Sequence, residues 1–209
     1  MVTVPRTFQN QAIYHIVNRG VEKRTIFQDR IDFRRFIRAL VFYQQVERST
    51  KLSLSKFRLV DRHSPFRFEV FAYCLMPNHF HLLVRQLVDG GISQGISEIC
   101  NSYTKFFNTR YTRVGPLFQG TFRAVRIETD DVLVHVCRYI FLNPVVASLA
   151  AAPGDYQWSS YRTIQSGDEF TAPSTFLDYF TDFKQFETFV IDHLDYARSL
   201  ESIKHLAID

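Results

Sequence analysis

Two apolar segments joined by a three-residue connection constrain the fold of this 209-residue chain more than any other feature. Residues 66–75 and 79–87 are rich in aromatic and aliphatic side chains, and Met76, Pro77 and Asn78 separate them. Apolar runs of this length on either side of so short a turn are typical of paired strands. The sequence therefore predicts a β-hairpin, around which the rest of the chain supplies further strands and helices.

Strand-like and helix-like segments alternate around this hairpin. Residues 12–18 predict a first strand that ends in a turn at Gly20. Apolar residues recur at helical spacing over 29–46 and again over 92–111. A polar, irregular connection spans 49–65, and residues 119–128 alternate as a fourth strand would. Thr129 is expected to cap a third helix over 132–142, which Pro144 stops soon after.

The predicted order is β-α-β-β-α-β followed by one more helix. This order matches the ferredoxin-like, split βαβ plan, an antiparallel sheet with two helices on one face. The predicted fold class is therefore α+β, with an added third helix and a helical C-terminal appendage. With 46% hydrophobic residues, the chain can form one well-packed core. We expect a domain over residues 1–150 and the appendage over residues 151–209.

An aromatic stripe characterises the appendage. Apolar side chains recur there three or four residues apart, a pattern more typical of a core than of a binding surface. The stripe is therefore predicted to pack the appendage onto the body. Its members are Phe176, Tyr179, Phe180, Phe183, Phe186, Phe189 and Val190.

Charge is divided unevenly between the two parts. Residues 1–150 hold 21 Lys and Arg against 11 Asp and Glu, a net charge of +10. Residues 151–209 hold 4 against 10, a net charge of −6. A basic body suits a polyanionic partner, of which nucleic acid is the commonest. The acidic tail either covers the basic body or forms a solvated helical face.

No targeting or redox feature stands out in the sequence. It has no run of about 18 apolar residues and no signal peptide, so an intracellular protein without a membrane span is expected. Cys74, Cys100 and Cys137 are far apart and not in C-x-x-C pairs. Their spacing suits neither a disulfide framework nor a zinc site, and we expect buried thiols.

Two histidines one residue apart, His79 and His81, lie in the second strand of the hairpin. Alternate side chains of a strand point to the same face, so both imidazoles should lie side by side. A divalent metal ion between them is one explanation. The alternative is a pair of hydrogen-bonded histidines on a half-buried strand.

Tyr139 and Asn143 lie four residues apart on the predicted third helix and therefore on one of its faces. They offer a hydroxyl and an amide oxygen. Taken alone, Tyr139 fits the core or the rim of an amphipathic helix, and Asn143 before Pro144 fits a helix end.

Five strings in this order resemble the REP-associated tyrosine transposases, relatives of the single-strand insertion-sequence transposases in the HUH nuclease superfamily. The resemblance covers about residues 8–165. The strings are Y-H-I-V-N-R-G at 14–20, M-P-N-H-F-H-L-L-V at 76–84, L-F-Q-G at 117–120, Y-I-F-L-N-P-V at 139–145 and W-S-S-Y at 158–161. The chain departs from the family pattern at Thr121 and Val146, where arginine is common, and at Ser148, where glycine is common.

The resemblance implies a role for each residue of the motifs. Tyr139 would be the nucleophile, on what is then a catalytic helix, and His79, His81 and Asn143 would hold a divalent metal ion. Two imidazoles and an amide oxygen suit Mn²⁺ or Zn²⁺ on chemical grounds, and the family is associated with Mg²⁺ or Mn²⁺. The implied reaction forms a 5′-phosphotyrosine intermediate and a free 3′-OH. The implied target is a single-stranded or hairpin DNA in the cytoplasm or nucleoid.

Basic and polar side chains are available for the DNA backbone. Tyr103, Phe107 and Tyr111 could stack on bases, but their helical spacing favours a core. The predicted DNA contacts are Arg19, Lys23, Arg24, Lys105, Arg110, Arg113, Gln119, Arg123 and Arg126.

Two other functions remain open from the sequence. A replication initiator or relaxase uses the same histidine pair, but it usually carries a helicase or primase domain, and no G-x-x-x-x-G-K-[ST] loop is present. A hairpin-binding protein that does not cut DNA would keep the fold alone. Either a monomer or a homodimer is compatible with the sequence.

Overall fold

The computed structural model describes residues 7–46, 52, 65–164, 171–172 and 174–194. These residues form a four-stranded sheet in the order β2-β3-β1-β4, in which every neighbouring pair is antiparallel. The order confirms the predicted ferredoxin-like α+β fold. The strands are β1 (Ile13–Arg19), β2 (Phe68–Met76), β3 (His79–Gln86) and β4 (Arg123–Ile127).

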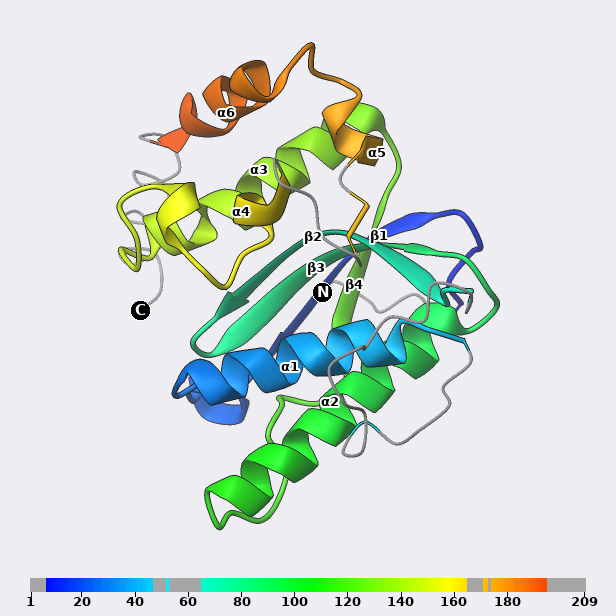
Figure 1. Ribbon diagram of the computed structural model, residues 1–209. Coiled ribbons are helices and arrows are strands. Elements are labelled where there is room, and N and C mark those ends of the chain that lie inside the picture. Colours follow the sequence, from blue (N-terminus) through cyan, green and yellow to red (C-terminus); the bar gives the residue numbers. More distant parts are fainter. Residues whose placement is uncertain (1–6, 47–51, 53–64, 165–170, 173, 195–209) are drawn as a thin grey trace, which may run out of the picture.

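Helices α1 (Arg30–Tyr43) and α2 (Gly91–Arg110) cover one face of the sheet, as predicted (Figure 1). The side chain of Asp29 caps α1 by accepting hydrogen bonds from the first-turn amides. Tyr103 and Phe107 are buried in the core beneath the sheet, so they are not available to stack on bases. The hydroxyl of Tyr111 donates to Asp32. The short helix η1 (Val21–Lys23) follows β1.

Helix α3 (Asp130–Val146) packs on the opposite face of the sheet (Figure 1). Phe176 and Phe186 are fully buried in a hydrophobic cluster with residues of α3. Tyr179, another member of the aromatic stripe, has 48% of its surface exposed. The appendage elements are η2 (Pro153–Asp155), α4 (Tyr161–Ile164), α5 (Ser174–Leu177) and α6 (Phe183–Ile191).

The predicted end of the third helix is wrong. Thr129 caps it as expected, but Pro144 lies inside α3, which continues to Val146. Proline fits helical φ, and although it lacks an N–H donor and its ring crowds the preceding turn, Pro144 is accommodated within the buried last turn. The helix ends where Ser148 adopts a left-handed φ of 57°, with the Leu149 N–H donating to the Pro144 carbonyl.

Other sequence predictions differ in detail. The fourth strand begins at Arg123 rather than Gln119, because the chain first turns at Gly120 with a φ of 81°. Cys74 and Cys137 are buried as expected, whereas Cys100 is partly buried. Most of the predicted 49–65 connection lies outside the described residues. Among the described helices, none is long and apolar enough to cross a membrane.

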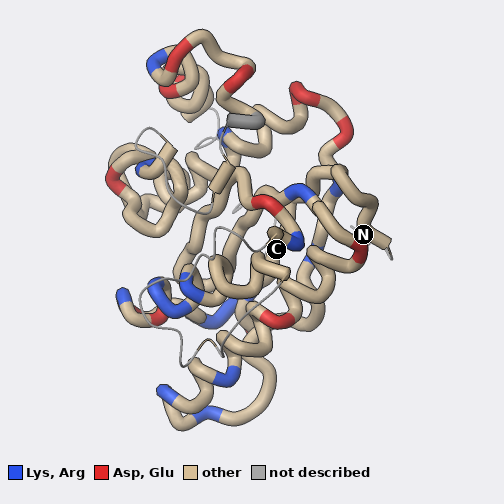
Figure 2. Tube along the Cα trace, turned by 45° about the vertical axis from the view of Figure 1, so that its right-hand side comes forward, with Lys and Arg blue, Asp and Glu red and all other residues tan. Residues whose placement is uncertain are grey.

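The charges follow the uneven division seen along the sequence. In Figure 2, Lys and Arg predominate in the lower half of the molecule, where α1 and α2 lie. The acidic residues are more frequent near the appendage. A polyanion would therefore meet the body of the protein rather than the outer side of the appendage.

Candidate active site

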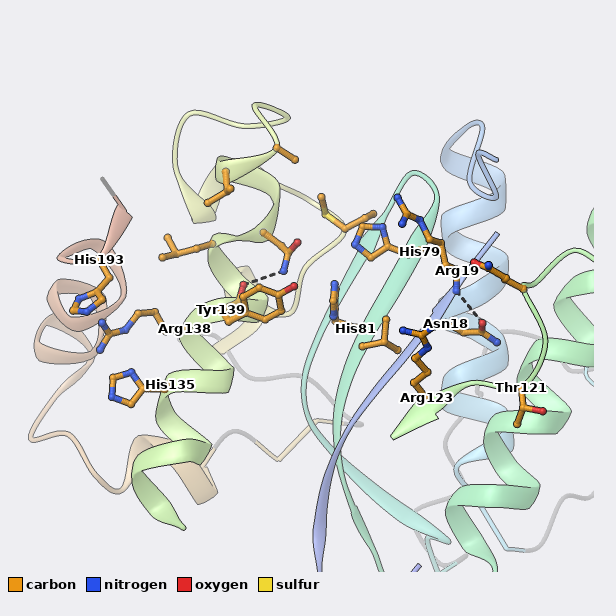
Figure 3. Close-up of a pocket in the computed structure, with 17 residues that line it drawn as sticks. Asn18, Arg19, His79, His81, Thr121, Arg123, His135, Arg138, Tyr139 and His193 are labelled. Atoms are coloured by element: carbon orange, nitrogen blue, oxygen red, sulfur yellow. Dashed lines mark hydrogen bonds between the residues drawn. The ribbon is translucent and has the colours of Figure 1, made fainter. Parts of the chain in front are cut away.

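A cavity of about 680 Å³ opens between the sheet and one face of α3 (Figure 3). The end of β1 and the start of β3 form its sheet wall, because Val17 pairs with His81 and Arg19 with His79 across the two strands. Helix α3 contributes the opposite wall. The cavity therefore lies where the end of β1 and the start of β3 face the added helix α3.

The two histidines of β3 point into this cavity, as strand alternation predicts. Their ring centroids lie 4.9 Å apart, with the planes nearly perpendicular. His81 is buried, with 3% of its surface exposed, whereas His79 lies nearer the opening. The rigid sheet fixes both rings at one point of the wall.

Each imidazole of the pair makes one polar contact through Nδ1. Nδ1 of His79 lies 2.6 Å from Oδ1 of Asn78. Nδ1 of His81 lies 3.0 Å from Nε2 of His15, a β1 residue. A neutral imidazole that donates from Nδ1 keeps a lone pair on Nε2. Nε2 of His81 is buried and has no hydrogen-bond partner among the described residues, so it is free to bind a cation.

Burial keeps these imidazoles neutral. It lowers the pKa of His15 to about 4. Burial, together with the charge of Arg19, lowers the pKa of His79 to about 4. Burial and the neighbouring His79 and His15 lower the pKa of His81 well below its usual value. Neutral imidazole is the form that binds metal ions, so the pair is ready to bind one at neutral pH.

Tyr139 lies on the α3 wall, facing the histidines, with 49% of its surface exposed. Its ring meets His81 edge to face at 5.4 Å between centroids and His15 at 6.1 Å. One turn later, the side-chain amide of Asn143 donates to the Tyr139 carbonyl over 3.1 Å. This bond uses the nitrogen of Asn143 and leaves its Oδ1 as a possible ligand.

The donor set fits a divalent cation with neutral ligands. Within the described part of the chain, no three His, Cys, Asp or Glu side chains form a group that could hold a metal. Two imidazoles and the Asn143 oxygen are instead available from the cavity walls. The unpartnered Nε2 of His81 is the observation that favours a bound cation over a merely structural histidine pair.

Comparison with known proteins identifies the family. The family model described as "Transposase IS200 like" matches residues 8–142. The chain belongs to this family. The transposase also resembles a solved structure titled "Structure of the REP associates tyrosine transposase bound to a REP hairpin". That likeness has a TM-score of 0.58 at 16% identity, covers 79% of this chain and 86% of the other, and shows a shared fold. No curated protein matches the sequence significantly.

Three of the predicted DNA contacts line the cavity of the transposase: Arg19, Gln119 and Arg123. Arg123 pairs with Val17 on β1, whereas Arg126 pairs with Tyr14 and faces the α1 and α2 side of the sheet. Thr121 and Val146, two of the departures from the family pattern, also line the cavity. At these two points the cavity has neutral side chains where arginine is common.

The other predicted DNA contacts lie away from the cavity. Arg110 forms ion pairs with Asp29 and Asp32 that join α2 to the start of α1. Arg113 donates to Asn108, Gly115 and Pro116 and so holds the turn after α2. These contacts give both arginines a structural use. Lys23 and Arg24 lie around η1, where Arg24 pairs with Glu22 at 3.3 Å, and Lys105 is exposed on α2.

Sequence reasoning missed several residues of the site. His15 was overlooked because its contact with His81 depends on the register between β1 and β3, which no local pattern reveals. His15 lies two residues before Val17 on β1, so strand alternation does place it on the cavity face. Arg138 and His135 also line the cavity. Arg138 lies four residues before Leu142 and His135 lies four residues before Tyr139, a helical spacing that could have indicated this. His193, which follows α6, carries no such signal.

Proposed function

We propose that this transposase cleaves and rejoins single-stranded DNA near hairpins, with Tyr139 as the nucleophile. The observation that carries the proposal is the meeting of Tyr139 with the neutral His79 and His81 pair across one cavity. A tyrosine at half exposure can reach a substrate phosphate, and the family supplies the DNA-acting context. The catalytic part is proposed to be residues 1–150, with residues 151–209 as its appendage.

The proposed chemistry conserves the energy of the phosphodiester bond. The Tyr139 hydroxyl gives up its proton as Oη attacks the scissile phosphorus, the bond to the 3′ oxygen breaks, and that oxygen takes up a proton to become a free 3′-OH. The phosphate stays on the 5′ end of the downstream strand as a phosphotyrosine ester. Attack of a 3′-OH on this ester releases the Tyr139 hydroxyl and rejoins DNA. Water in place of the tyrosine would lose this reversibility.

His79, His81 and Asn143 are proposed to hold Mg²⁺ or Mn²⁺. Such an ion, when bound, polarises the phosphate and stabilises the charge on the departing oxygen. The protein's own contribution is to fix the ligands: Asn78 orients His79, and His15 orients His81. The Asn143 bond to the Tyr139 carbonyl holds the third donor one turn from the nucleophile.

The proposed substrate is a hairpin with a single-stranded flank, in the cytoplasm or nucleoid of a bacterium. A flexible single strand can bend into a cavity that lies between a sheet and a helix. Arg19 and Arg123 supply positive charge along the sheet wall. The solved structure of similar fold carries a REP hairpin, which supports a hairpin substrate here.

The test is incubation of the protein with a labelled hairpin oligonucleotide and Mn²⁺, followed by a denaturing gel. We expect a labelled protein band for the wild type and none for Tyr139→Phe or for the double variant His79→Ala/His81→Ala. A wild type that retards several hairpins on a native gel without ever forming the band would instead be a hairpin-binding module. The same preparation, measured by light scattering, distinguishes monomer from homodimer.

A further inference from the structure

Arg138 lies beside the nucleophile and forms no ion pair with an acidic side chain in the described part of the chain. It has 6% of its surface exposed, and its Nε and Nη1 atoms are buried without a hydrogen-bond partner in the described chain. No described carboxylate forms an ion pair with it, and burial lowers the pKa of its guanidinium, which the charge of Asp192 offsets only in part. Three other arginines differ in this respect: Arg67 pairs with Glu98, Arg85 with Glu69, and Arg110 with Asp29 and Asp32.

A buried, unpaired guanidinium is costly unless an anion completes it. A buried charged donor without a hydrogen-bond acceptor carries its full desolvation penalty. The carbon of the Arg138 guanidinium lies 3.5 Å from the ring centroid of Phe189 on α6. This stacking occupies a face of the guanidinium, but its N–H donors point outward in its plane, and the buried Nε and Nη1 have no acceptor in the described chain. Stacking alone therefore explains the orientation of Arg138 but not its missing acceptors.

Two histidines accompany Arg138 at the same end of the cavity. His135 lies one turn earlier on α3, and His193 follows α6, with 6.4 Å between their ring centroids. We call His135, Arg138 and His193 the α3–α6 corner. Figure 3 shows this corner on one side of Tyr139 and the His79 and His81 pair on the other. All three corner residues line the same cavity as Tyr139.

We propose that the α3–α6 corner binds a backbone phosphate of the DNA strand, next to the phosphate that Tyr139 attacks. A phosphate diester presents two oxygens that match the paired N–H donors of a guanidinium. The proposal rests on the proposed function, since it assumes a DNA strand in the cavity. The strand would then run from Arg19 and Arg123 on the sheet wall, past Tyr139, to Arg138 at the opposite end.

The test is a methylphosphonate walk, in which one phosphate at a time is made neutral along the single-stranded flank of the hairpin. Binding is measured at fixed salt with the Tyr139→Phe protein, so that no cleavage occurs. We expect one position, beside the scissile phosphate, where the neutral linkage weakens binding about tenfold. With Arg138→Gln added, the unmodified hairpin should bind about tenfold more weakly, and that position should no longer respond.

The matched control is Arg162→Gln, the same change at an exposed arginine of α4 outside the cavity. It should keep the whole walk profile of the parent. If Arg138→Gln fails to fold by circular dichroism, the double variant His135→Gln/His193→Gln replaces it, because both side chains are exposed. A weaker response at the same position then supports the proposal.

The proposed phosphate site would be contradicted if the Arg138 or corner-histidine variants left the walk profile unchanged. It would also be contradicted if no neutral linkage in the single-stranded flank weakened binding. Either result leaves the proposed function standing if the wild type still forms the labelled covalent band. Conversely, a coupled phosphate without any covalent band would keep the corner as a binding site and remove the proposed cleavage.

Discussion

At the scale of single residues, the candidate site depends on how each histidine is held. His81 lies deep in the wall, and its Nδ1 contacts a single described group, Nε2 of His15. Partners of this kind fix the tautomer and ring orientation of a metal ligand. We therefore propose that His15 is a positioning residue, which would act on a bound metal ion only through His81.

This arrangement predicts that His15→Ala weakens Mn²⁺ binding by about 10- to 100-fold, the range typical of lost second-layer hydrogen bonds. The change removes the group that contacts Nδ1 of His81 and so orients its ring. Isothermal titration calorimetry of the protein without DNA measures it. His15→Gln, whose amide oxygen can accept the same bond, should restore part of the affinity. Wild-type Mn²⁺ affinity in His15→Ala would contradict this role.

The sequence allows some of these residues to be predicted and not others. His79 and His81 follow from strand alternation, and Tyr139 and Asn143 follow from helical spacing, because both patterns are local. The contact of His15 with His81 and that of Arg138 with Phe189 join segments 66 and 51 residues apart. Contacts of that kind depend on strand register and helix packing, which single-sequence patterns do not determine.

At the scale of elements, the end of α3 carries a strained residue. Ser148 adopts a φ of 57°, the left-handed region that favours glycine, and closes the helix there. The helix was predicted to stop near Pro144 because proline lacks an N–H donor. The helix instead continues through Pro144, because packing of the buried last turn against the rest of the protein outweighs the preference of proline for a helix end.

Ser148→Gly is expected to raise the free energy of unfolding by about 1 kcal/mol, because glycine adopts this φ without a Cβ clash. Urea denaturation measures the change. Ser148→Ala is the matched control, since it removes the hydroxyl but keeps the Cβ, and it should give no gain. Equal effects of the two substitutions would show that backbone strain is not the cause.

The start of α1 predicts a pH dependence. The hydrogen bonds from Arg110, and then those from the backbone N–H groups of Asp32 and Ile31, lower the pKa of Asp29 to about 2. Its folded pKa lies below its unfolded value of 3.8, so its charge stabilises the protein above about pH 4. That contribution is lost as the pH falls towards 2.

Asp29→Asn keeps a capping acceptor but removes the charge. The wild type should therefore be more stable than this variant at pH 5, and the difference should shrink between pH 4 and pH 2. Thermal unfolding of both proteins across this range measures it. A difference that stays constant down to pH 2 would rule out ionised Asp29 as its source.

At the scale of the whole molecule, one sheet carries two hydrophobic cores, one on each face. The first lies under α1 and α2, and its presence follows from the predicted order of elements. The second lies between the sheet, α3 and the appendage. The aromatic stripe predicted that the appendage packs on the body, but not that it packs against α3, because a stripe does not identify its partner.

Phe186 should contribute strongly to this second core. It is fully buried, and its ring meets Phe141 of α3 and Phe176 of α5 at 6.1 and 5.6 Å between centroids. Phe186→Ala is expected to lower the free energy of unfolding by about 3–5 kcal/mol, by loss of burial and creation of a cavity. Tyr179→Ala, at an exposed member of the same stripe, should cost less than about 1 kcal/mol. Similar losses in both would show that burial in the second core is not what sets the cost.

The position of α3 between the sheet and the appendage has a consequence for subunit exchange. Tyr139 lies on α3 facing the histidine pair of β3, and α3 is enclosed between the sheet and the appendage. Swapping α3 between two copies would require the buried aromatic contacts with α6 to open or to travel with it. Mixed Tyr139→Phe and His79→Ala/His81→Ala chains should therefore fail to complement one another.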